Sequence, residues 1–162
     1  MSYVFFDLDK TLIRTQSQGL LIQALHKRKL ISFFTLWKLR IFFLRYKLHL
    51  IGEGGMLKIY AEAAKLIKGI EVEQLRKVIR AFVFAEFADI QNTRAVEELE
   101  KHISAGKQVV LTSAAFEPVV EAAAKFFHIP EYESSKLKIE NGLYTGELDG
   151  TPFTSMAYLN VG

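Results

Sequence analysis

The first residues of the chain combine a short apolar run with two acids, and this combination constrains the fold more than any other stretch. The run Tyr3-Val4-Phe5-Phe6 is followed by Asp7 and Asp9, with Leu8 between them. Such a run predicts a strand buried on both faces, as in parallel α/β sheets. Open α/β sheets bind their ligands at the carboxyl ends of the strands. In an extended chain both carboxylates point the same way and Leu8 points toward the core, so we predict a ligand site at this strand end.

Two interpretations of the acid pair remain open from the residues alone. Carboxylates that face the same way repel each other unless a cation lies between them, usually a divalent one with oxygen ligands. This favours metal-assisted chemistry on an anionic, oxygen-rich substrate. Alternatively, the strand ends in an Asx-type turn in which Asp9 caps a helix, which is a purely structural role.

A second strand signal lies much later in the chain. Gln108-Val109-Val110-Leu111 predicts a buried strand that ends at Thr112-Ser113, and a helix is expected from Phe116 to about Phe127. The Ser113 hydroxyl, nearby backbone N–H groups and the helix dipole form a candidate phosphate site. Serine at such a turn is also a common helix N-cap, which is the structural alternative.

Helical patterns fill the sequence between these two strand signals. Apolar spacing predicts helices at 14–28, 30–50, 56–68, 71–88 and 94–104. The glycine-rich stretch 52–55 lacks the spacing of nucleotide-binding loops, so we expect a hinge or turn there. Near the end, Asn141-Gly142 with alternating flanks predicts a hairpin of 136–139 and 143–147. The expected fold class is therefore α/β.

Composition narrows the class of protein. Half of the 162 residues are hydrophobic, so the chain can bury a core as one domain. It has no cysteine, which excludes disulfides and thiolate metal sites and fits a reducing compartment. Asp7 and Asp9 interrupt the first apolar run too early for a signal peptide. We expect a cytoplasmic location, with a membrane-peripheral one as the open alternative.

The charge of the chain is unevenly distributed. Residues 10–52 contain nine Lys or Arg and no Asp or Glu, although the net charge is only +3. Within 30–50 one apolar helical stripe is expected, formed by Leu30, Phe33, Phe34, Trp37, Ile41, Leu44 and Leu48. Charges near the centre of this helix would each cost roughly 2.5–3.5 kcal/mol in a bilayer, so a membrane-spanning helix is disfavoured.

Two roles remain open for the basic, aromatic segment 27–50. It fits an amphipathic helix on an anionic membrane surface, with membrane or anion contacts from Lys38, Arg40, Arg45 and Lys47. It also fits a cap or dimer-interface helix whose apolar stripe meets other protein. Single-stranded nucleic acid is a weaker version of the first role, so we expect no nucleic-acid partner. The oligomeric state stays open.

The first motif, FFDLDKTL, resembles the first motif of the haloacid-dehalogenase-like (HAD) phosphohydrolases. The stretch AGKQVVLTSAAFEPVVEAAAKFFHI resembles their second motif, and LKIENGLYTGELDGTP resembles the segment after that motif in the phosphoserine-phosphatase-like branch, subfamily IB. This resemblance implies a Rossmann-like parallel core of residues 1–13 and 91–162. It implies an inserted all-helical C1 cap at residues 14–90.

The resemblance also implies roles for individual residues. Asp7 would be the nucleophile that becomes an aspartyl-phosphate, and Asp9 would be the general acid/base. Mg²⁺ would be held by the Asp7 carboxylate and the backbone carbonyl of Asp9. Ser113 would bind the phosphoryl group together with Thr11, and Thr112 is the less favoured register. The implied function is hydrolysis of small phosphomonoesters.

Two departures from the family pattern matter. The family needs a later lysine and an acidic pair, whereas after Gly150-Thr151-Pro152 the chain reads FTSMAYLNVG, and Lys136 and Lys138 come too early. We therefore expect either a fragment or a naturally shortened protein. In both cases the core sheet would lack later strands and the first strand would be poorly covered. We expect this chain alone to have poor activity or none. Arg14 to Gln18 also lacks the acid that holds the amine of phosphoserine. A strongly anionic or lipid-linked phosphate is the expected substrate, and a non-enzymatic module that binds anionic membranes through 27–50 is the alternative.

Overall fold

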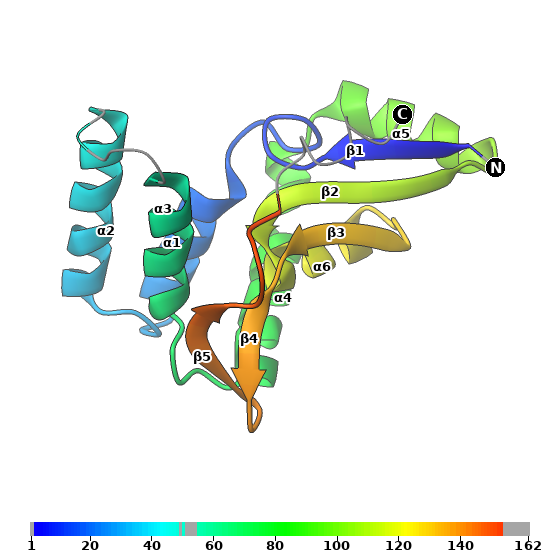
Figure 1. The fold of residues 1–162 in the computed structure, drawn as a ribbon. Helices are drawn as coiled ribbons and strands as arrows, with labels where there is room; N and C mark the ends of the chain where they lie inside the picture. The colour runs from blue at the N-terminus through cyan, green and yellow to red at the C-terminus, as the bar shows by residue number, and fades with distance from the viewer. Residues whose placement is uncertain (1, 49, 51–54, 154–162) are drawn as a thin grey trace.

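A computed structural model describes residues 2–48, 50 and 55–153 of the chain (Figure 1). The elements follow one another as β1 (Tyr3–Asp7), α1 (Ser17–Lys27), α2 (Phe33–Lys47), α3 (Gly55–Lys65), α4 (Val72–Ile90), α5 (Thr93–Ser104), β2 (Gln108–Phe116), α6 (Glu117–Phe126), β3 (Glu131–Ser135), β4 (Leu137–Glu140) and β5 (Leu143–Leu148). The α/β class, the helices and the hairpin are confirmed. The turn expected at 52–55 falls mostly outside the described residues.

The core is a three-stranded parallel sheet in the order β1-β2-β3. β2 is its central strand, and α5 and α6 pack against it (Figure 1). Val109, Val110 and Leu111 are almost fully buried, which explains why this segment reads as a continuous apolar run. β3 was not predicted, because its sequence EYESS carries no apolar run.

The prediction that β1 is buried on both faces is wrong for the described part of the chain. Phe6 is 9% exposed, but Tyr3 and Phe5 on the other face are 54% and 47% exposed. β1 is also an edge strand of the described sheet, so it has a pairing strand on one side only. This agrees with the expectation that the first strand is poorly covered.

β2 is longer than the expected strand. It continues past Ser113 to Phe116, because it pairs with β3 after its pairing with β1 has ended at Thr112. The β2–β3 register shifts between Thr112 and Phe116, which marks an irregularity at this point. Ser113 therefore lies at the end of the β1 pairing and not at the end of the strand.

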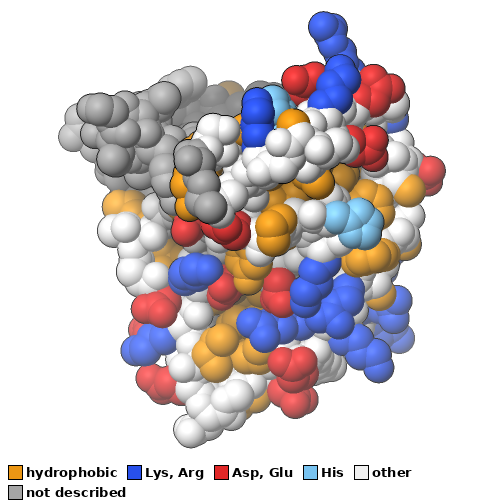
Figure 2. Space-filling model, turned by 90° about the vertical axis from the view of Figure 1, so that its right-hand side faces the viewer, with side chains coloured by type: hydrophobic (Ala, Val, Ile, Leu, Met, Phe, Trp, Pro, Cys, Tyr) orange, Lys and Arg blue, Asp and Glu red, His pale blue; other side chains and the backbone are white. Residues whose placement is uncertain are grey.

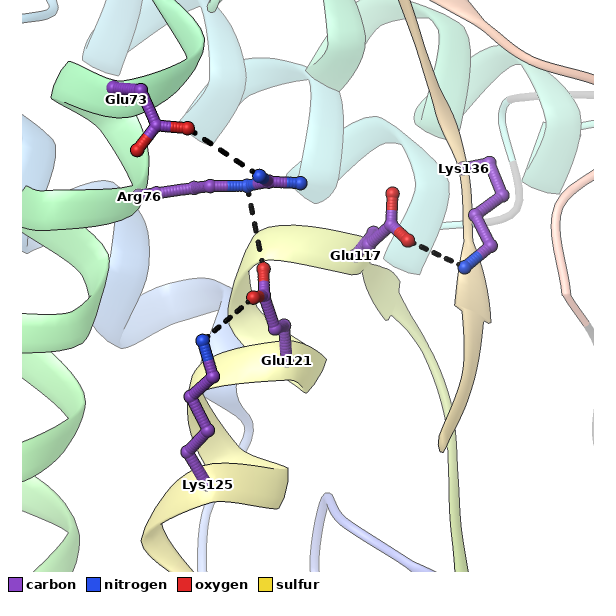
Figure 3. A network of polar contacts seen from close by, with 6 residues as sticks. All are labelled: Glu73, Arg76, Glu117, Glu121, Lys125 and Lys136. Carbon is purple, nitrogen blue, oxygen red and sulfur yellow. Dashed lines mark hydrogen bonds and ion pairs between the residues drawn. The ribbon is translucent and has the colours of Figure 1, made fainter. Parts of the chain in front are cut away.

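Helix α4 joins the helical segment to the core, because it packs against α6. Arg76 of α4 lies 3.6 Å from Glu73 and 3.4 Å from Glu121 of α6, and Lys125 lies 2.9 Å from Glu121 (Figure 3). Burial alone would raise the pKa of Glu121, but Lys125 and Arg76 hold this pKa below its usual range. These contacts anchor α4 on the sheet layer.

The β4–β5 hairpin is bonded to the helical segment as well. Gly69 donates to the Tyr144 carbonyl at 2.8 Å, Tyr144 donates to Ile70 at 3.0 Å, and Val72 donates to Gly142 at 3.0 Å. The hairpin thus extends the backbone hydrogen bonding of the segment between α3 and α4. The predicted division into a core (1–13 and 91–162) and a cap (14–90) stays a prediction.

Within the described part of the chain, no helix combines the length and the apolar character that crossing a bilayer requires.

Candidate active site

Asp7 is placed by the pairing of β1 with β2. It is the last residue of β1 and lies opposite Thr112 in the parallel register. The Thr112 hydroxyl is buried and donates to the Phe6 carbonyl at 3.3 Å, so it serves the junction of the two strands. Ser113 is the next residue along β2. The carboxyl end of β1 and the point where β2 leaves it therefore form one edge of the sheet.

Asp9 is held by the start of α1. Its Oδ1 accepts a hydrogen bond of 2.6 Å from the backbone N–H of Ser17, and Gln16, the N-cap residue, makes no side-chain cap bond. An N–H at a helix start is a natural partner for a carboxylate. The structural alternative, Asp9 as a helix cap, is thus present in the fold. The same bond holds one Asp9 carboxylate oxygen in place, and the charge of Asp9 acts on Asp7.

Buried side chains and a distant asparagine hold the loop after β1. Leu8, Leu12 and Ile13 are 0% exposed. Asn92, just before α5, donates from its backbone to the Leu12 carbonyl at 2.8 Å and from its side chain to the Thr11 carbonyl at 3.1 Å. The loop that follows Asp7 and carries Asp9 is therefore tied to the junction of α4 and α5.

Asp7 has an unusual electrostatic setting. Burial of part of its carboxyl raises its pKa above the usual value of 3.8, and the negative charge of Asp9 raises it further. The backbone N–H of Leu8 and the Thr11 hydroxyl, which lies 3.4 Å from Oδ2, act in the opposite direction but only partly compensate. A proton or a cation would relieve this repulsion.

The carboxylates at this edge form a pair and not a larger cluster. In residues 2–48, 50 and 55–153, no group of three or more His, Cys, Asp or Glu side chains is placed to hold a metal ion. Mg²⁺ commonly takes one or two carboxylates and fills its other positions with water and substrate phosphate. The raised pKa of Asp7 next to Asp9 fits such a partial site.

Ser113 is 2% exposed, and its hydroxyl oxygen accepts a 3.1 Å hydrogen bond from the Ala115 N–H. This bond does not use the hydroxyl hydrogen. The buried Ser135 of β3 donates to the Ala114 carbonyl at 2.8 Å and so secures the same part of β2. The irregular part of β2 after Thr112 is thus held by contacts within β2 and from β3.

Tyr60 of α3 was missed by sequence reasoning. Its side chain is hydrogen-bonded to Gln18 and lies within the electrostatic influence of Asp9. Burial raises the pKa of Tyr60 above its usual value, Asp9 raises it further, and the bond to Gln18 lowers it only in part. The ring is 6% exposed and meets Phe116 edge-on at 5.9 Å between centroids. Tyr60, Gln18 and Phe116 line a small, mainly apolar cavity of about 50 Å³. A tyrosine inside an apolar helical stripe gives no sequence signal of this role.

Within the described part of the chain, the basic residues singled out in the sequence form no ion pair with Asp7 or Asp9. Lys136 donates to Glu117 at 2.7 Å (Figure 3), and Lys138 lies 3.5 Å from both Glu140 and Glu147. Lys38, Arg40 and Arg45 are exposed on α2, and the side chain of Lys47 lies outside the described residues. Arg40 also lines a cavity of about 300 Å³ with Gln16 and Gln18, which flank Ser17.

Comparison with known proteins places the chain in a family. A family model described as haloacid dehalogenase-like hydrolase matches residues 4–157. The "Inhibition of morphological differentiation protein" of Streptomyces azureus is 24% identical over 151 residues, which cover 90% of this chain and 53% of that protein. The chain thus spans about half the length of this curated relative.

Solved structures share the fold. A protein of unknown function from Bordetella pertussis Tohama I has a TM-score of 0.80 at 20% identity, covering 94% of this chain and 68% of that one. A phospho-aspartyl intermediate analogue of phosphoserine phosphatase has a TM-score of 0.52 at 16% identity, covering 91% and 62%. At these identities the two likenesses show a shared fold.

Proposed function

Because the chain belongs to the haloacid dehalogenase-like hydrolase family, we propose that it cleaves phosphomonoesters by way of a phosphorylated Asp7. The observation that carries this proposal is the pair of carboxylates at the end of β1: Asp9 is held by the Ser17 N–H, and the loop that follows Asp7 is anchored by Asn92. The fold likeness to a phospho-aspartyl analogue of phosphoserine phosphatase supports it.

In this proposal Asp7 and Asp9 divide the chemistry. A carboxylate oxygen of Asp7 attacks phosphorus, and the bond from phosphorus to the ester oxygen breaks. Protonated Asp9 gives its proton to the departing oxygen, so the alcohol leaves neutral. Asp9 then takes a proton from a water molecule whose oxygen attacks the aspartyl-phosphate, which releases phosphate and restores Asp7. The 2.6 Å bond from Ser17 would keep Asp9 oriented through both steps.

The remaining residues would bind and position the phosphoryl group. Ser113, where the β1–β2 pairing ends, and Thr11 would donate their hydroxyl hydrogens to phosphoryl oxygens. Mg²⁺, held by the Asp7 carboxylate and the Asp9 backbone carbonyl, would supply positive charge that offsets the charge of the transferring group.

For the substrate we propose a strongly anionic or lipid-linked phosphate ester. Arg40 beside Gln16 and Gln18 in the larger cavity and the lack of acids in residues 10–52 support this choice. We also propose that residues 14–90 act as a cap over the core of residues 1–13 and 91–162. The reach of Tyr60 from α3 toward Asp9 supports this division.

Covalent trapping tests the nucleophile without depending on turnover. The chain is incubated with radiolabelled acetyl phosphate and Mg²⁺, precipitated and treated with hydroxylamine, which cleaves acyl phosphates. We expect hydroxylamine-sensitive label on the wild type and on the Asp89→Asn control, since Asp89 is an exposed acid of α4. Asp7→Asn should carry no label.

Asp9→Asn separates the two roles. It should retain labelling at Asp7, because acetyl phosphate has a good leaving group, but it should release the label more slowly, because no base activates water. Label that persists in Asp7→Asn would contradict the proposal. So would label release from Asp9→Asn at the wild-type rate.

A further inference from the structure

Helix α2 has two apolar sides. One side meets the protein through Leu36, Leu39 and Phe42, of which Leu39 is 5% exposed. The other side holds Phe33, Phe34, Trp37, Ile41, Leu44 and Leu48, which are 57%, 78%, 52%, 48%, 57% and 59% exposed. In Figure 1, α1 and α3 lie on one side of α2 and no described element lies beyond it. The stripe seen in the sequence is therefore the outer side of this helix.

Basic residues border this outer side. At 3.6 residues per turn the six exposed apolar residues cover about 100° of the helix circumference. Lys38 and Arg45, seven residues apart, follow one edge of this arc, and Arg40 lies at the opposite edge. All three side chains are exposed, and α2 contains no acid.

We propose that the outer side of α2 docks on the surface of an anionic lipid bilayer. A helix of this kind lies in the plane of the interface with its apolar side about 5–10 Å below the headgroups. Lys38, Arg45 and Arg40 at the two edges then extend to the lipid phosphates while their stems stay in apolar surroundings. Trp37, in the middle of the arc, has the amphipathic ring that suits this depth.

Charge argues against the other occupants of this surface. A second copy of α2 would bring its own Lys and Arg rows against these rows, with no acid on either helix to pair with them. The face opposite α2 has a different charge pattern. Figure 2 shows the side that faces away from α2, where acidic and basic side chains lie near one another. An anionic membrane is the partner that matches both the apolar arc and its basic borders.

Docking would also orient the candidate active site, although the docking itself does not rest on the proposed function. Arg40 belongs both to the basic border and to the cavity between α1 and α2. Gln16 and Gln18, on the far wall of this cavity, flank Ser17, which holds Asp9. A bound bilayer would therefore lie next to a cavity whose lining includes the two chain neighbours of Ser17.

Trp37 makes the proposal directly measurable because it is the single tryptophan of the chain. The chain is titrated with vesicles of phosphatidylcholine alone and with vesicles in which about a third of the lipid is phosphatidylglycerol. We expect co-sedimentation with the anionic vesicles, a shift of Trp37 emission to shorter wavelength and quenching by bromine-labelled acyl chains. Added salt should weaken binding, and neutral vesicles should bind little.

Two triple variants separate charge from apolar contact. Lys38→Gln, Arg40→Gln and Arg45→Gln together should lower the partition coefficient on the order of 100-fold, whereas the matched triple Lys77→Gln, Arg94→Gln and Lys107→Gln should change it little. Phe34→Ser, Ile41→Ser and Leu44→Ser together should lower it by a similar factor and leave Trp37 as reporter. Their control changes the exposed Leu57, Ile103 and Leu143 to Ser. All of these positions are exposed, so the variants should fold.

Three outcomes would overturn the proposal. Equal binding to both kinds of vesicle, or binding that the α2 charge triple does not weaken, would exclude an anionic membrane as the selected partner. Dimerisation that the α2 apolar triple abolishes, without vesicle binding, would assign the surface to a second copy. Absence of both vesicle binding and self-association would remove the membrane role.

Discussion

The loop after β1 and helix α2 are both rich in apolar residues and lie close together in the sequence, yet the apolar side chains of the loop are buried and many of those on α2 are exposed. Leu8, Leu12 and Ile13 of the loop are 0% exposed, whereas Phe34 and Leu44 of α2 are 78% and 57% exposed. The loop meets the α4–α5 junction through Asn92 and backbone hydrogen bonds. The outer side of α2 meets no described element. Apolar content alone therefore does not predict burial; the presence of a facing partner decides it.

The difference also separates two kinds of site. In the loop, the buried side chains of Leu8, Leu12 and Ile13 hold the backbone next to Asp7 and Asp9, so changes there should affect stability and the proposed site together. On α2, the exposed apolar and basic residues contribute little to folding and remain available for binding. Substitutions of the same chemical kind should therefore have different effects in the two regions.

The largest contrast is expected from the same deletion in both regions. Leu12→Ala should lower the free energy of unfolding by about 2–5 kcal/mol, because it removes a fully buried side chain and leaves a cavity. Leu44→Ala should change it by less than about 0.5 kcal/mol, because Leu44 already faces solvent. Denaturant titration followed by circular dichroism measures both values. A large loss in Leu44→Ala would show that the outer side of α2 is covered in the folded protein.

Much of the fold could be predicted from local patterns. The end of β1, the first residues of β2 and the hairpin at Asn141-Gly142 were predictable because each has a run or an alternation that identifies it. The apolar stripe of α2 was also visible in the sequence. Its exposure was not, because α2 has a second apolar side, with Leu39, and periodicity cannot tell which of two sides faces the protein.

The candidate site could be predicted only in part. Asp7, Asp9, Thr11 and Ser113 stand next to strand signals, and the structure places them along one edge of the sheet, although their roles stay predictions. Asn92 and Tyr60 could not be found, because their partners lie far away in the sequence: Asn92 bonds Thr11, and Tyr60 is close to Asp9. Asn92 also looks like an ordinary N-cap before α5, yet it makes no side-chain cap bond there.

Asn92 therefore offers the next test of how the loop is held. Asn92→Ala should cost about 1–2 kcal/mol, because it removes the side-chain bond to the Thr11 carbonyl. Asn92→Asp keeps a good helix cap but has no N–H to donate, so it should cost at least as much. Denaturant titration of the three proteins measures the difference. Wild-type stability in Asn92→Asp would mean that capping α5, and not holding the loop, is what this residue does.

A smaller effect, with a sign that depends on pH, is expected at Asp7. Burial raises its pKa in the folded protein above 3.8, so the folded state holds the proton more tightly than the unfolded state does. Ionisation therefore opposes folding as the pH rises through these values, and the cost is fully present above the folded pKa. Asp7→Asn should raise the melting temperature at neutral pH, and this gain should disappear below about pH 3.8.

The matched change on α2 has no such dependence. Arg45→Gln neutralises an exposed charge, so it should shift the melting temperature little at either pH. Melting curves of both variants at neutral and acidic pH give the comparison, without added divalent cation. A lower melting temperature in Asp7→Asn at neutral pH would mean that the carboxylate is stabilised in the fold, in contradiction to its raised pKa.

The smallest effect is expected from a change to glycine, which suits the backbone at Lys10 and destabilises the helix at Lys38. Lys10 adopts φ 60°, in the left-handed region that favours glycine, so Lys10→Gly removes steric strain of about 1–2 kcal/mol but adds chain entropy of about 0.5–1 kcal/mol to the unfolded state. A net gain of a few tenths of a kcal/mol to about 1 kcal/mol should remain. Lys38→Gly, in the middle of α2, should instead lose about 0.7–1 kcal/mol because glycine is a poor helix former. Equal losses in both variants, measured by denaturant titration, would mean that Lys10 is not strained and that the loop tolerates its conformation without cost.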